Sequence, residues 1–169
     1  SAQSSSYYAK LLRVNGWSGG TVGEAFCSPY SSLAAHPQGE RFYALNGRDY
    51  WKRLTRYELP PGWVTFSTDR RLETPETFGS RFWITPDGSR ILGSLGRMYA
   101  LSNDPATDLI EQLPLGSLEI MAAAFDPNTD VIATAEGTGL RYYNLQSYYR
   151  FAETELGTAA SQLGFVGTR

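Results

Sequence analysis

Cysteine and histidine are nearly absent from this sequence of 169 residues, which contains one of each. A single cysteine, Cys27, excludes an intrachain disulfide, and a single histidine, His36, excludes a metal site built on several imidazoles. No hydrophobic run is long enough to span a membrane. The net charge is only −2 and the basic residues form no stripe, which argues against nucleic acid as the main partner.

The sequence is rich instead in aromatic residues and turn formers, with 11 Tyr, 8 Phe, 4 Trp, 17 Gly and 9 Pro. This mixture is typical of short strands joined by turns, and the length suits one domain with a sizeable core. Residues 1–6 read as a linker or tail, because they have neither the basic start nor the apolar core of a signal peptide. Either the protein is cytoplasmic or a targeting segment lies outside this chain.

A hairpin signature recurs three times. Residues 81–94 read RFWITPDGSRILGS, in which an apolar run meets Thr-Pro-Asp-Gly and a second apolar run follows. Proline suits the second position of a turn, and Asp and Gly tolerate the next positions, so we predict a strand, a tight turn and a strand. Matching segments surround Pro37 and Pro127, at proline spacings of 49 and 41 residues.

Two more strands follow each hairpin and complete a unit of four. In the second and third units they fall in LGRMYALSND and GLRYYNLQS, then in TDLIEQLPLG and YYRFAETELG. In the first unit we expect the fourth strand at WVTFST, residues 63–68, followed by an insertion at 69–79. One further outer strand is expected at 7–16 and one inner strand at 159–168.

Four-stranded units of this length predict an all-β fold: a β-propeller, or a propeller segment, of antiparallel four-stranded blades. The propeller segment covers residues 7–169 and contains about three full blades plus one outer and one inner strand. The blades are expected at 30–80, 81–118 and 119–157. A β-solenoid would need shorter coils and would not group its strands in fours.

The segment ITPDGSRILGSLGRMYALSND resembles the repeat of YVTN-type, or surface-layer-protein-type, β-propellers, whose blades carry an SPDG hairpin. The resemblance covers about three blades, from Tyr30 to Gly157, although ILGS and VIAT stand where the YVTN tetrad would be. It implies a location in the cell envelope or outside the cell. WD-repeat propellers fit less well, because no blade has a Gly-His start or a Trp-Asp end.

Three blades and two spare strands are fewer than most closed propellers contain, which is about four to eight blades. Exposed edges of this kind invite pairing with other strands. Three arrangements remain open. The chain is a fragment of a longer protein, or copies associate into a homo-oligomer that completes a ring, or 7–14 and 162–167 share one blade of a small ring.

Motifs typical of catalysis or metal binding occur only as partial matches. Residues 16–20, Gly-Trp-Ser-Gly-Gly, have the spacing of a hydrolase serine turn, but no helical pattern follows them. Residues 126–130 begin like a calcium loop, but Val131 and Gly137 replace the Gly and Glu that such a loop needs. His36 precedes the first turn, where a side chain that bonds the turn backbone is expected. We therefore predict no catalytic residue, no metal site and no cofactor.

Aromatic residues are the remaining candidates for function. Adjacent tyrosines, Tyr142-Tyr143 and Tyr148-Tyr149, should point one ring between blades and the other outward. Three tryptophans lie in the irregular part of the chain, where long loops able to bind partners concentrate. Together with an arginine they are the predicted binding residues: Trp17, Trp51, Trp63 and Arg53.

The leading hypothesis is a non-enzymatic interaction module, part of a larger protein, that binds a protein or a cell-surface polymer through its loops. The competing hypothesis is a propeller hydrolase or lactonase with a metal in the central channel. Its available ligands would be Asn103, Asp104 and Glu136, which lie near strand ends. A third hypothesis is a structural spacer within a surface protein. A propeller fold alone does not decide among these, because it supports both binding and catalysis.

Overall fold

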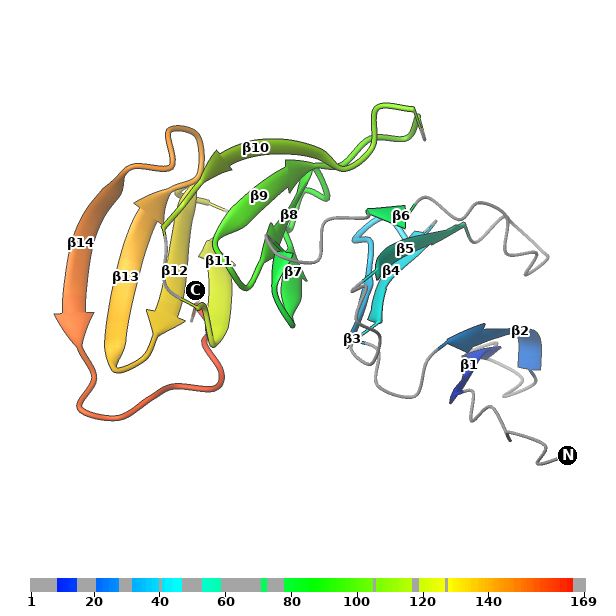
Figure 1. Ribbon diagram of the computed structural model, residues 1–169, viewed down its shortest axis with the longest axis horizontal. Helices are drawn as coiled ribbons and strands as arrows, with labels where there is room; N and C mark the ends of the chain where they lie inside the picture. Colours follow the sequence, from blue (N-terminus) through cyan, green and yellow to red (C-terminus); the bar gives the residue numbers. More distant parts are fainter. Residues whose placement is uncertain are drawn as a thin grey trace, which may run out of the picture. The chain divides into compact units, whose positions relative to one another are not determined.

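The computed structural model describes residues 9–14, 21–27, 32–39, 41–46, 53–58, 71–72, 78–104, 106–116, 119–126 and 128–165. Its regular elements in these segments are antiparallel strands, grouped into one two-stranded sheet and three four-stranded sheets (Figure 1). The chain divides into two compact units, Ser1–Pro75 and Glu76–Arg169. Among the described residues, no helix is long and apolar enough to cross a membrane.

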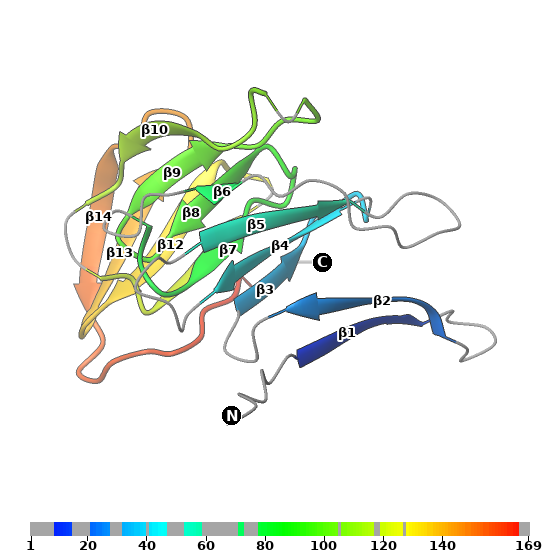
Figure 2. The same ribbon diagram turned by 45° about the vertical axis from the view of Figure 1, so that its right-hand side comes forward.

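The first unit contains the two-stranded sheet and the first four-stranded sheet. Strands β1 (Ala9–Val14) and β2 (Thr21–Cys27) pair with each other, Ala9 opposite Cys27. The first four-stranded sheet follows chain order, as Figure 2 shows. Its strands are β3 (Ser32–Ala35), β4 (Arg41–Asn46), β5 (Arg53–Glu58) and β6 (Arg71–Leu72).

The second unit contains two more sheets of the same kind, each with its strands in chain order (Figure 1). The second sheet consists of β7 (Phe82–Ile84), β8 (Arg90–Gly93), β9 (Arg97–Ala100) and β10 (Ile110–Pro114). The third sheet consists of β11 (Ala122–Asp126), β12 (Val131–Glu136), β13 (Gly139–Asn144) and β14 (Arg150–Glu155). Each four-stranded sheet lies within one of the three residue ranges expected for blades.

The hairpin signature forms the turns that the sequence predicts. In the first two hairpins the amide of the fourth turn residue, Gly39 or Gly88, donates to the carbonyl of His36 or Thr85 at 2.8 Å. Both glycines have a φ of +72°, a conformation that other residues rarely adopt. The third hairpin reaches the same reversal through Asp130, which has a φ of +53°.

The side chain that precedes each turn proline bonds the turn itself, as we expected for His36. The Gln38 amide donates to His36 Nδ1 at 3.3 Å. Thr85 Oγ1 accepts from the Arg90 amide at 3.0 Å. The Asn128 amide donates to Asp126 Oδ1 at 2.9 Å. Each of the three side chains thus accepts a hydrogen bond from a backbone amide of its own hairpin. The interpretation of residues 126–130 as a blade turn is confirmed.

The second and third sheets share one apolar core. Leu92 and Met98 of the second sheet pack with Ile132 and Tyr143 of the third, all at most 2% exposed. Leu115, Ile120 and Leu145 complete this cluster. A hydrogen bond also links the two sheets. Arg81, just before β7, donates to the carbonyl of Met121, just before β11, at 2.8 Å. Burial of several large apolar side chains, each contributing about 1.5–3 kcal/mol, makes this contact the main stabilising feature of the second unit.

Two sequence expectations about strands are wrong, and one strand was not expected. Residues 21–27 form β2 as the partner of β1, whereas no strand was predicted over this segment. The fourth strand of the first sheet is β6, Arg71–Leu72, inside the expected insertion, whereas 63–68 lie outside the described residues. No strand forms over 159–165, the described part of the expected inner strand. A strand requires a hydrogen-bonding neighbour, and the third sheet already has its four strands without this segment.

Candidate interaction surface

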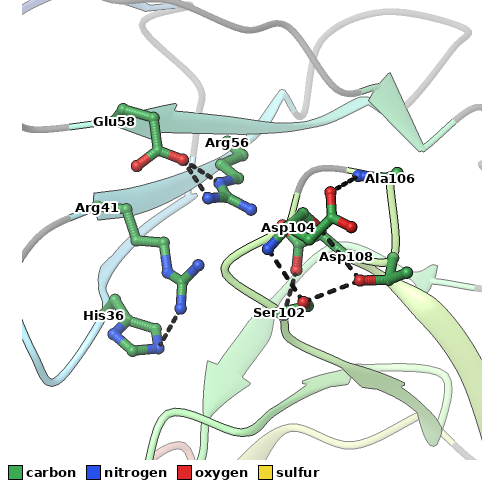
Figure 3. Close-up of polar contacts among 9 residues, drawn as sticks. His36, Arg41, Arg56, Glu58, Ser102, Asp104, Ala106 and Asp108 are labelled. Carbon is green, nitrogen blue, oxygen red and sulfur yellow. Dashed lines mark hydrogen bonds and ion pairs between the residues drawn. The ribbon is translucent and has the colours of Figure 1, made fainter.

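The first four-stranded sheet and its first hairpin turn contain a cluster of polar side chains, namely His36, Arg41, Arg56 and Glu58 (Figure 3). His36, Arg41 and Arg56 are all buried. An Arg41 guanidinium nitrogen lies 3.2 Å from His36 Nε2, and Arg56 forms an ion pair with Glu58. Because β4 and β5 pair Arg41 with Glu58 and Tyr43 with Arg56, these side chains share one face of the sheet. His36 therefore belongs to the structure of the turn and this cluster.

The loop between β9 and β10 contains two acidic residues, Asp104 and Asp108 (Figure 3). Asp108 is fully buried and its Oδ1 accepts from the Ser102 amide at 2.9 Å. Asp104 Oδ1 accepts from the Ala106 amide at 2.9 Å, and Thr107 bonds Ser102 through their hydroxyls. Both carboxylates thus order the backbone of their own loop, which is the usual role of Asp in turns.

A third cluster surrounds Glu136, which lies at the end of β12 and is 4% exposed. Its carboxylate accepts from Thr134 Oγ1 at 2.9 Å and from the Tyr143 hydroxyl at 3.0 Å. Arg141 forms an ion pair with its other oxygen. Arg141 also lies 3.6 Å from Glu153, which pairs with Arg150 at 2.8 Å. The cluster connects β12, β13 and β14 on the face of the third sheet that packs against the second.

Burial and charge set the protonation of this cluster. Burial first, and then the Glu136 carboxylate, raises the pKa of Tyr143 from 10.0 to about 12. Burial alone would lower the pKa of Arg141, but the interactions with Glu136, Tyr143 and Glu153 together outweigh it and raise that pKa. Tyr143 therefore stays neutral and Arg141 stays charged at physiological pH. The arrangement has the properties of a structural ion network.

The metal ligands of the enzyme hypothesis do not come together in the described residues. Asp104 lies in the β9–β10 loop of the second sheet and accepts from a backbone amide there. Glu136 lies in the third sheet, where it pairs with Arg141 and accepts from Thr134 and Tyr143. Among the side chains that the structure describes, no three His, Cys, Asp or Glu residues form a group able to hold a metal ion.

The predicted binding residues are placed only in part. Trp17, Trp51 and Trp63 lie outside the described residues. Arg53 begins β5, opposite Asn46 of β4, and its side chain is likewise outside the described part of the structure. Their role in binding stays a prediction.

The tyrosine pairs behave as predicted, and one of them marks an exposed surface. Tyr143 and Tyr148 pack on the core between the second and third sheets. Tyr142 is half-buried, and Tyr149 is 70% exposed. Arg150, with half of its side chain exposed, follows Tyr149 directly. We call Tyr149 and Arg150 the rim pair. The alternation of the strand predicts that one tyrosine of the pair faces outward, but neither Tyr149 nor Arg150 is among the predicted binding residues.

Comparison with known proteins supports the fold. The β-propeller domain of Cps50 (Swd1) from Myceliophteria thermophila matches with a TM-score of 0.60 and 11% identity, covering 79% of this chain and 46% of that one. U3-55K matches with a TM-score of 0.53 and 11% identity, covering 78% of this chain and 41% of that one. No protein-family model and no curated protein matches the sequence.

These matches show that the chain is all-β and has the antiparallel four-stranded sheets of a β-propeller, structurally similar to WD40-type domains. The sequence favours YVTN-type repeats over WD repeats, whereas the similar structures are of the WD40 type. The chain spans less than half of the length of both matched structures. From here on we call the three four-stranded sheets blades 1, 2 and 3 in chain order.

Proposed function

We propose that the chain is a non-enzymatic β-propeller interaction module that binds a protein partner through its loops and its rim. The observation that carries the proposal is the rim pair, Tyr149 and Arg150, which folding leaves exposed at the start of the outer strand of blade 3. Tyrosine and arginine are enriched among the residues that dominate binding energy at protein interfaces. The predicted loop residues Trp17, Trp51, Trp63 and Arg53 would extend the same kind of surface.

The polar clusters support this proposal because each has a role within its own blade. His36 bonds its turn, Asp108 orders its loop, and Glu136 neutralises Arg141. Side chains committed in this way stabilise a rigid scaffold on which loops can present a binding surface. A cell-surface polymer is the alternative ligand, since exposed aromatic rings also stack on sugars. The Pro-Asp-Gly hairpin of blade 2 supports the finer proposal of a YVTN-type propeller in the cell envelope.

Binding measurements on the full chain test this proposal. Partners are trapped by chemical crosslinking, identified, purified and titrated against the protein by calorimetry. Replacing both rim residues, Tyr149→Ser with Arg150→Gln, should weaken the affinity about tenfold or more. Thr158→Ala, a change of an exposed residue that follows β14, is the control and should leave the affinity unchanged.

The predicted loop residues are tested in the same assay with Trp17→Ala, Trp51→Ala, Trp63→Ala and Arg53→Ala. At least one of them should weaken binding, with an unchanged circular dichroism spectrum. The proposal is contradicted if neither the rim nor the loop variants change any affinity. It is also contradicted if the protein hydrolyses a lactone or ester, loses this activity to a chelator and regains it with a divalent cation.

A further inference from the structure

The outer strands of the three blades differ in how open their free edges are. β6 has two residues, and β10 ends at Pro114 after a shift in its register with β9. Short strands, proline and bulges are devices with which proteins block an edge against further pairing. β14, the outer strand of blade 3 (Figure 1), has six exposed residues and no proline, and five of them are in register with β13. Blade 3 therefore has the most open edge of the three.

The hydrogen bonding of β14 indicates which residues present their backbone groups to this edge. The Leu156 amide donates to the Thr138 carbonyl at 2.8 Å. In an antiparallel pair, residues that exchange hydrogen bonds with the neighbouring strand alternate with residues that do not. Counted back from Leu156 along the β13–β14 register, Thr154 bonds to β13. Glu153 and Glu155 therefore point their amides and carbonyls outward, away from the sheet.

The side chains of β14 give the two faces of this edge different chemistry. Glu153 and Glu155 are two residues apart, so both lie on one face, and both are exposed. The opposite face carries Ala152, which pairs with Tyr142. It also carries Phe151, which is 53% exposed and whose ring centroid lies 6.3 Å from that of Tyr142. A strand laid along the edge would meet carboxylates on one face and an aromatic ring on the other.

We propose that the edge of β14 binds an extended segment of a protein partner, in which basic and apolar residues alternate and which adds a fifth strand to blade 3. This inference rests on the proposed function and names the kind of partner that the rim binds. Residues directly opposite each other in paired strands lie on the same face. Basic side chains opposite Glu153 and Glu155 would therefore meet opposite charges, and the apolar residues between them would cover the exposed ring of Phe151.

The two glutamates do not contribute equally to this complementarity. Glu153 already pairs with Arg150 at 2.8 Å, whereas the Glu155 carboxylate accepts from the Thr138 hydroxyl at 3.0 Å. Glu155 therefore supplies most of the negative charge that an added strand would meet. In this mode of binding, main-chain hydrogen bonds provide affinity and alternate side chains provide specificity.

A short acetylated peptide in which lysine and valine alternate is the probe, titrated against the full chain by calorimetry. Binding is expected, with the lysines opposite the two glutamates and their amides directed at β14. N-methylation of the lysine amides should weaken the affinity about tenfold or more, because it removes those hydrogen bonds. N-methylation of the valine amides is the matched control, since these point away from β14, and it should leave the affinity nearly unchanged.

Protein variants test the same edge from the other side. Glu155→Pro removes an outward amide but no hydrogen bond to β13, so the circular dichroism spectrum should persist while the affinity for the peptide falls about tenfold or more. Glu155→Gln keeps the amide and should weaken binding about fivefold at most, as expected for an exposed charge. Glu111→Gln, at a 41% exposed glutamate of β10, is the control and should have no effect.

Amide hydrogen exchange, read by NMR, locates the bound peptide. The amides of Glu153 and Glu155 should exchange fast in the free protein and slowly with the peptide, whereas the Thr154 amide should be protected in both. The proposal is overturned if the peptide does not bind at about 1 mM, if the two methylated peptides bind equally, or if both glutamate amides keep their exchange rates. Protection of both amides without peptide, at a mass of two chains, would assign the edge to a second copy and also overturn it.

Failure of this inference is distinguishable from failure of the proposed function. The proposed function is tested with the crosslinked partner and with the rim and loop variants, none of which involves the lysine–valine peptide. A partner whose binding depends on the rim or loop residues, together with a peptide that does not bind, would leave the proposed function in place and overturn strand addition at β14 alone.

Discussion

The two faces of blade 3 differ, although the same four strands make both. The face toward blade 2 carries Ile132 and Tyr143, which are 0% and 2% exposed, together with the ion network of Glu136. The opposite face carries alanines, Tyr142 and the half-exposed Phe151. The strand alternation that buries one residue turns the next one outward. The alanines of the opposite face are themselves buried, at most 9% exposed, so the two faces differ in exposure chiefly at the outer strand, where Phe151 is 53% exposed.

The largest effect should come from breaking the ion network on the face toward blade 2. Glu136→Ala removes the carboxylate that neutralises the largely buried Arg141 and accepts from Thr134 and Tyr143. Breaking a buried pair in this way costs about 3–5 kcal/mol. Urea unfolding monitored by circular dichroism measures the change in the free energy of unfolding.

The control for this variant is Glu153→Ala, which removes the exposed partner of Arg141. An exposed ion pair contributes at most about 1 kcal/mol. Equal losses of stability in the two variants would contradict the assignment of Glu136 as the centre of the network.

The next effect should come from a cavity in the core between blades 2 and 3. Ile132→Ala removes a fully buried side chain from that core, and we expect a loss of about 3 kcal/mol in the free energy of unfolding. Val131→Ala alters the adjacent residue, which is half-buried and points to the face turned away from blade 2, and it should cost about 1 kcal/mol. If Val131→Ala were the more damaging change, the assignment of the two faces would be wrong.

The smallest effect concerns Tyr143 and depends on pH. Folding raises the pKa of Tyr143 from 10.0 to about 12, because burial and the Glu136 carboxylate disfavour the phenolate. The folded state therefore holds this proton more tightly, and its stabilising contribution is fully present below pH 10. It is lost as the pH rises from 10 to 12, by roughly 2 kcal/mol.

Tyr143→Phe should lose about 1 kcal/mol at pH 7, since one hydrogen bond to Glu136 is removed. It should also show a smaller fall in stability above pH 10 than the original protein, with the remainder due to Tyr148, whose pKa is also raised by burial. Urea unfolding at a series of pH values, on both proteins, provides the test. Parallel curves for the two proteins above pH 10 would mean that another group causes the alkaline loss of stability.

Much of the fold could be predicted from local chemistry. Proline at the second turn position, with Gly39 or Gly88 at the fourth, specifies a tight reversal almost by itself. The alternation of Tyr142 and Tyr143 likewise places one ring in the core. The short strand β6 could not be predicted, because two residues carry no periodicity and depend on pairing with Leu54 and Thr55. β2 was missed because its sequence, TVGEAFC, contains a central glycine and has no clean alternation.

The clusters of the candidate site were predicted less well than the fold. Glu136 and Arg141 are close in sequence, but their pairing depends on the β12–β13 register and on the core that buries them. From the sequence alone Glu136 could be considered a metal ligand, because its pairing with Arg141 is not visible there. In the structure its carboxylate forms an ion pair with Arg141. The rim pair was overlooked for a related reason: exposure of Tyr149 is decided by where Tyr148 packs, and that is a tertiary contact.

Hydroxyl-radical footprinting tests the comparison of the two faces most directly, because it reads the accessibility of individual side chains. We predict rapid oxidation of Phe151, which is 53% exposed, and protection of Tyr143, which is 2% exposed. Equal oxidation of Phe151 and Tyr143 would contradict the account that the two faces of blade 3 differ.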